Sequence, residues 1–200
     1  DKAITFGYRI LAKDPNNLVK VFALAQLHYK ANNFNLSLKL CAIIANKDSL
    51  HQKSMQLAAL NLVELKAPDK AMELYKGMAA KFNNPNYLYQ ASVVAFEAKK
   101  FDTCIAAITA LLKDSLSMQQ KIVITRQNAI GKTVSEEISL IAAAYNILGF
   151  VSMEQSNLAN AKAYFERALA IEPTFVLAEN NLKGLLKKEK ESPIKKEEEK

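Results

Sequence analysis

The sequence predicts an all-helical fold built from repeated pairs of helices, and three observations support this prediction. Half of the 200 residues are hydrophobic, but there are only 5 glycines and 5 prolines, too few breakers for a turn-rich β-sandwich. Aromatic residues make up 8% with no tryptophan, and the abundant alanine, leucine and lysine favour helix. Similar segments also recur along the chain, which is typical of a short repeat array.

Four segments resemble one another, and they begin at Leu24, Ala58, Ala91 and Leu148. The first three are spaced by 34 and 33 residues, and the last follows after 57. Each contains a small or apolar pair, a polar break and a second apolar run. The key positions of that second run follow at offsets of four and three, so they share one face of a helix. These positions are Ser37, Ala71, Cys104 and Ala161, then Cys41, Tyr75, Ile108 and Phe165, then Ile44, Met78, Leu111 and Ala168.

The last of these units resembles the tetratricopeptide repeat family. Its matching residues are Leu148, Gly149, Ala161, Phe165, Ala168 and Pro173. Tyr145 stands where the family prefers tryptophan, and Ser152 replaces a residue that is usually a large aromatic. The resemblance implies a right-handed α-solenoid of helix–turn–helix repeats.

The period and the turn residues divide the chain into repeats and flanking segments. Asn-, Asp- and Pro-containing stretches supply the stops between helices. The expected segments are a second helix of an incomplete repeat (1–17), repeats at 18–51, 52–84, 85–118 and 142–175, an insertion (119–141), a capping helix (176–189) and a disordered tail (190–200). Helices are expected near 2–13, 18–31, 34–46, 51–65, 68–81, 86–98, 101–113, 137–154, 158–170 and 174–189.

The chain opens with half a repeat. Ala3, Gly7, Ile10 and Pro15 match a second helix, and Ala3 precedes Ser37 by 34 residues. Because an uncapped inner helix exposes an apolar face, we expect a longer parent protein with a segment upstream.

The insertion interrupts the period and has two interpretations. Ile122 and Ile124 alternate with Val123 and Thr125, and a polar stretch containing Gly131 follows, which predicts a protruding β-hairpin. The alternative is a capping box formed by Thr133 and Glu136, which would start the next helix early.

The sequence after the last repeat predicts a terminal cap followed by a tail. Val176, Leu177, Leu182, Leu185 and Leu186 form an amphipathic pattern that would cover the open end of the array. Beyond about residue 190 the chain is nearly all lysine and glutamate, a composition that cannot form a core.

No pattern of catalytic, metal or cofactor residues stands out, so we expect neither an enzyme nor a cofactor. Gly131-Lys132-Thr133 resembles the end of a phosphate loop, but Arg126 occupies the place of the required glycine. His28 and His51 lack partners at metal-ligand spacing. Cys41 and Cys104 are interpreted as small core residues.

The net charge of +7 comes almost entirely from scattered lysines, which indicates a solvated surface rather than a nucleic-acid interface. No apolar run is long enough to span a membrane. The lysine-, asparagine- and isoleucine-rich composition suggests an AT-rich bacterial genome. Similar repeat proteins of such bacteria are often exported, which favours the cell envelope (periplasm) over the cytoplasm as an expectation.

The family resemblance implies that the first helix of each repeat lines a concave groove. The family's chaperone-binding members hold a terminal carboxylate with Lys and Asn at places where this chain has Phe22 and Gln26, so that clamp is absent. The groove residues would be Phe22, Gln26, Tyr29, Gln56, Leu60, Tyr89, Val93, Phe96, Asn146, Phe150 and Met153.

This apolar and aromatic stripe predicts a non-catalytic scaffold that binds a partner peptide or helix. One alternative is that the stripe only packs against neighbouring helices. A second is a basic adaptor for nucleic acid or an anionic membrane surface. A third is weak self-association through the opening half repeat.

Overall fold

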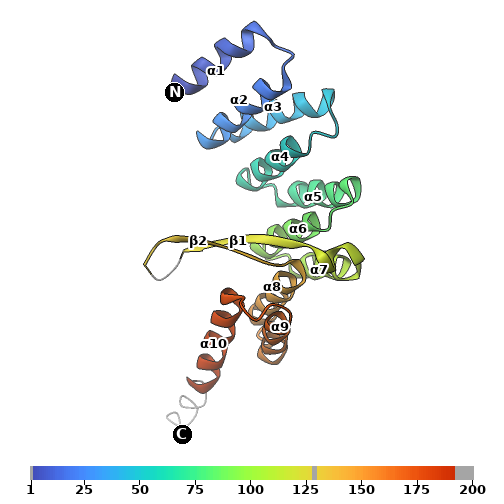
Figure 1. Ribbon diagram of the computed structural model, residues 1–200, viewed down its shortest axis with the longest axis vertical. Helices are drawn as coiled ribbons and strands as arrows, with labels where there is room; N and C mark the ends of the chain where they lie inside the picture. The colour runs from blue at the N-terminus through green and yellow to red at the C-terminus, as the bar shows by residue number, and fades with distance from the viewer. Residues whose placement is uncertain (1, 128–129, 192–200) are drawn as a thin grey trace. The chain divides into compact units, whose positions relative to one another are not determined.

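The computed structural model describes residues 2–127 and 130–191, and it divides into two compact units, Asp1–Ala98 and Lys99–Lys200. Within the described residues there are ten α-helices and one two-stranded sheet, so the predicted all-helical repeat fold with a hairpin is confirmed (Figure 1). The first unit contains α1 (Lys2–Lys13), α2 (Leu18–Lys30), α3 (Phe34–Lys47), α4 (Gln52–Glu64), α5 (Pro68–Phe82) and α6 (Asn86–Glu97). The second contains α7 (Phe101–Lys113), a 3₁₀ turn (Ser115–Gln119), β1 (Lys121–Gln127), β2 (Thr133–Ser139), α8 (Leu140–Glu154), α9 (Leu158–Ile171) and α10 (Val176–Glu191).

One tight turn recurs after each first helix of a pair. A residue with left-handed backbone ends the helix at Asn32, Lys66, Lys99 and Ser156, with φ of 59°, 58°, 56° and 59°. In three of these turns the amide of the residue after the left-handed one donates a hydrogen bond to the carbonyl oxygen five residues earlier. These bonds run from Asn33 to His28 (2.8 Å), from Ala67 to Leu62 (2.9 Å) and from Asn157 to Ser152 (2.8 Å). In the pairs α2–α3, α4–α5 and α8–α9 the left-handed residue and this bond reverse the chain, so the second helix folds back on the first.

In the pairs α2–α3, α4–α5 and α8–α9 the core lies between the two helices. The three equivalent positions predicted on each second helix are buried in α3, α5, α7 and α9. In the last repeat, Gly149 of α8 faces the ring of Phe165 on α9 at close range. A small residue on the first helix and a large one on the second therefore set the spacing of this pair.

Helix α1 has no buried residue, unlike the second helices of the complete repeats. Its contact with α2 is made through Gly7, which faces Leu24, and through Tyr8, whose hydroxyl lies 3.0 Å from Nε2 of His28. Phe6 is 63% exposed on the opposite side. The helix is thus covered on one side only.

The insertion forms a β-hairpin, and the alternative of an early helix start is wrong. The strands pair antiparallel with Ile122 opposite Ile138, both buried, at the base of the hairpin. Glu136 belongs to β2, and α8 begins at Leu140 instead of residue 137. The backbone groups of these β-branched residues are hydrogen-bonded between the two strands. A capping box would instead have placed them in the first turn of a helix.

Helix α10 covers the open side of the last repeat. Phe175, Ala178 and Leu185 are fully buried, and Leu185 clusters with Ala161 and Phe165 of α9. The tail predicted for residues 190–200 lies, from residue 192 onward, outside the described residues.

Candidate partner-binding groove

The first helices α2 and α4 line a groove of about 510 Å³ in the first unit. Four predicted groove residues meet there, two from each helix. Leu60 is 42% exposed, an unusually open position for a leucine in this unit's first helices. The lining consists of Phe22, Gln26, Lys53, Gln56, Leu57 and Leu60.

Contacts outside the groove hold its walls in place. The ring of Phe22 packs edge-on against His51, with centroids 5.3 Å apart, and His51 caps the start of α4 by accepting the Ser54 amide at 3.1 Å. The Nε2 of Gln56 donates to the Tyr87 hydroxyl at 2.9 Å, and Gln52 donates to the same oxygen. The wall is therefore tied to α6, which reduces the ordering cost of binding.

The groove is apolar with a single charge among its lining residues. Phe22, Leu57 and Leu60 supply the apolar surface, and Gln26 and Gln56 supply amide groups at its side. Lys53 provides the positive charge. An apolar side chain flanked by backbone or carboxylate groups would complement such a surface.

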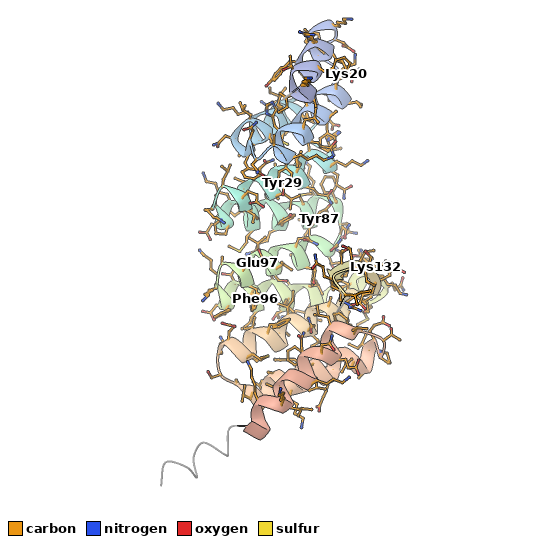
Figure 2. The ribbon with its side chains drawn as sticks, turned by 90° about the vertical axis from the view of Figure 1, so that its left-hand side faces the viewer. Lys20, Tyr29, Tyr87, Phe96, Glu97 and Lys132 are labelled. Carbon is orange, nitrogen blue, oxygen red and sulfur yellow. The ribbon has the colours of Figure 1, made fainter. Side chains whose placement is uncertain are left out.

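The remaining predicted residues of the first unit are partly buried. Tyr29 packs edge-on against Phe34, with centroids 5.6 Å apart, and burial, reinforced by the negative charge of Glu64, raises the pKa of its hydroxyl. Tyr89, Val93 and Phe96 follow at offsets of four and three along α6, so they share one side of that helix. Burial raises the pKa of Tyr89 to about 12. Figure 2 shows Tyr87 and Phe96 toward opposite ends of α6.

The three predicted residues of α8 contact other helices of the second unit. Asn146 is only 4% exposed, and its Oδ1 accepts the Nδ2 of Asn181 on α10 at 2.8 Å. Phe150 packs edge-on against Phe165 with centroids 5.8 Å apart, and Met153 packs against the cluster of Ala161, Phe165 and Leu185. Asn146 is therefore enclosed within the unit, whereas Phe150 and Met153 remain partly exposed beside these contacts.

Two lining residues, Lys53 and Leu57, were not predicted from the sequence. Gln56, Leu57 and Leu60 follow Lys53 by three, four and seven residues, so all four lie on one side of α4. This spacing was a usable signal, but the predicted residues were chosen at positions equivalent from repeat to repeat, and Lys53 and Leu57 lie beside those positions.

Among residues 2–127 and 130–191, no group of three metal-binding side chains gathers in space. Cys41 and Cys104 are buried thiols, and burial raises the pKa of each to about 12. Over the same residues, no helix combines the length and apolar character needed to cross a bilayer.

Comparison with known proteins matches the last repeat to a family model and the whole fold to solved structures. Residues 142–175 match the tetratricopeptide repeat model. The crystal structure of MamA superposes with a TM-score of 0.61 at 15% identity, covering 86% of this chain and 87% of that one. PilF of Pseudomonas aeruginosa gives 0.60 at 18% identity, covering 87% and 69%. YrrB, described as a TPR protein with an unusual peptide-binding site, gives 0.60 at 13% identity, covering 91% and 82%.

Residues 142–175 are a tetratricopeptide repeat, and the fold of the chain is that of a tetratricopeptide-repeat solenoid. At these identities the structural matches show the fold of this chain alone. An uncharacterized protein, ycf37 of Pyropia yezoensis, is 46% identical over 43 residues, which is 22% of this chain and 24% of the relative. The matched stretch thus spans about a quarter of that protein's length.

Proposed function

We propose that this tetratricopeptide-repeat protein is a non-catalytic scaffold that binds an apolar segment of another protein in the groove between α2 and α4. The fold itself suggests a protein–protein interaction scaffold. The single observation that carries the finer proposal is the meeting of Phe22, Gln26, Gln56 and Leu60 around one open groove.

The chemistry of the groove supports a peptide ligand. Burial of one large apolar side chain between Phe22 and Leu60 would contribute about 1.5–3 kcal/mol to the binding free energy. The amides of Gln26 and Gln56 can pair with peptide groups of an extended chain, and Lys53 would favour a neighbouring acidic residue. The peptide-binding site of YrrB, a protein of similar fold, supports the same ligand class.

A peptide-display selection on the whole chain tests the proposal. A selected peptide should bind the Leu60→Asp variant at least tenfold more weakly, because a carboxylate would then be buried against its apolar anchor. Leu36→Asp is the matched control, since Leu36 of α3 is 44% exposed but lies outside the groove.

Salt distinguishes this function from a basic adaptor for nucleic acid or anionic membranes. Binding to the groove should change little between low and physiological salt, whereas an electrostatic adaptor would lose affinity steeply. Equal binding by Leu60→Asp and the wild type would contradict the groove proposal.

A further inference from the structure

A second pocket lies in the first unit on the other side of α4, between the second helices α3 and α5. Its volume is about 240 Å³, and it is separate from the proposed peptide groove, because it shares no lining residue with it. Small side chains dominate the lining, and four of the ten are alanine or cysteine. The pocket is lined by Leu38, Cys41, Ala42, Ala45, Ser49, Ser54, Met55, Ala58, Leu74 and Lys81.

The internal repeats explain why this space is open. At the position of Cys41, the other second helices carry Tyr75, Ile108 and Phe165. Tyr75 reaches forward from α5 and stacks on Tyr87 in the first turns of α6, with centroids 6.3 Å apart. One repeat earlier, the short Cys41 packs with Leu57 of α4, and the pocket beside it is bordered by Ser54 and Met55 at the start of that helix.

The pocket interior is apolar and uncharged. Burial raises the pKa of the Cys41 thiol to about 12, so the thiol is neutral at physiological pH. Apolar cavities of this order take up small apolar molecules more readily than water, which needs several polar partners.

The rim of the pocket carries a positive charge. The Nζ of Lys81 donates to the carbonyl oxygen of Ser49 at 2.6 Å, across the pocket mouth. Within the described part of the chain Lys81 has no acidic partner, so its charge is balanced only by a backbone dipole and by solvent. A carboxylate at the mouth would complement this ammonium group.

We propose that the pocket between α3, α4 and α5 binds a small organic acid with an aromatic or branched apolar body. The body occupies the space beside Cys41 and Met55, and the carboxylate pairs with Lys81. At the packing density of protein interiors, about 0.75, this volume holds roughly a dozen non-hydrogen atoms. The inference is independent of the groove function, since it uses other residues and another ligand class.

The experiment is a titration of the whole chain, labelled with ¹³C at its methionine methyl groups, with 3-phenylpropionate. The Met55 signal should shift saturably, while the signal of Met153, which lies in the second unit, should stay in place. The uncharged 3-phenylpropanamide should bind roughly two- to fivefold more weakly, the range expected for a solvent-exposed ion pair. Lys81→Gln should reduce the affinity for the acid to that of the amide.

Two variants that fill the pocket serve as controls. Cys41→Tyr introduces the residue found at the same position of the next repeat, and it should abolish the Met55 shift. Because this variant can disturb the core, Ala42→Phe, at an exposed position of the lining, is the second filling variant. The proposal is overturned if Met55 shows no saturable shift, if a folded filling variant responds like the wild type, or if the amide binds wild type as tightly as the acid.

Discussion

Gly149 of α8 lies directly against the ring of Phe165 on α9, so closely that a Cβ atom at position 149 would be 2.6 Å from Cδ1 of the phenylalanine. Phe165 is fully buried, and its ring also packs against Phe150. The ring therefore has no room to retreat, and the absence of a side chain at position 149 is a condition for this helix pair to close.

Gly149→Ala should destabilise the protein by about 1–3 kcal/mol, because the added methyl group forces the helices apart or the ring off its rotamer. Gly77→Ala on α5 is the matched control, since nothing lies within 4 Å of a Cβ built there. That control should raise stability by roughly 0.5–1 kcal/mol through higher helix propensity. Urea unfolding of both variants measures the difference, and equal effects would show that the close approach does not constrain α8 and α9.

Phe165→Ala should cost about 3–5 kcal/mol of unfolding free energy, because it empties a fully buried site. Phe96→Ala and Tyr89→Ala should cost less, since both side chains are only partly buried on α6. If these residues also contact a partner, each truncation should weaken binding by about 1–3 kcal/mol. Thermal unfolding of the three variants measures and compares their losses of stability. A Phe96→Ala variant that unfolds as readily as Phe165→Ala would assign Phe96 to the core and remove it from any binding surface.

Lys66→Gly should stabilise the protein by roughly 0.5–1 kcal/mol. Lys66 has a φ of 58° at the turn between α4 and α5. This conformation is unfavourable for any residue that has a Cβ atom, but glycine adopts it at little cost in free energy. Lys76→Gly, at an exposed position inside α5, should instead destabilise by about 1 kcal/mol. Chemical unfolding of the two variants should give opposite signs. A loss of stability in both would mean that the lysine side chain contributes more at the turn than its backbone strain costs.

The contact between α1 and α2 should weaken in mild acid. Burial lowers the pKa of His28 below its ordinary value of 6.5, and its ring accepts or donates a hydrogen bond with Tyr8. The unfolded chain therefore binds the proton more readily, so the contribution to stability is complete above pH 6.5 and is lost as the pH falls below that value. For one group the slope cannot exceed about 1.4 kcal/mol per pH unit.

Urea unfolding at about pH 7.5 and about pH 5.5, on either side of the ordinary histidine pKa, measures this effect. His28→Gln should show a smaller difference between the two pH values than the wild type. An unchanged difference in the variant would assign the acid sensitivity to other groups.

The repeat architecture of this protein follows from local sequence patterns. The spacing of Ser37, Ala71, Cys104 and Ala161 places the second helices, because side chains three and four residues apart must share a helical face whatever their surroundings. The alternation around Ile122 likewise predicts the hairpin, since a period of two suits a strand and not a helix.

Which surfaces remain open depends on tertiary packing and could not be predicted in the same way. Phe22 and Leu60 border a groove, while on a later first helix Asn146 is buried against Asn181 of α10 and Phe150 is partly covered by Phe165 of α9. Helical periodicity gives the direction of a side chain but does not say which residue lies opposite to it. The opposing residue comes from 31 to 35 positions away, as in the pairs Gln56 with Tyr87 and Asn146 with Asn181. The pocket beside Cys41 has the same origin, because a short side chain leaves a hollow only where the neighbouring helices do not close over it.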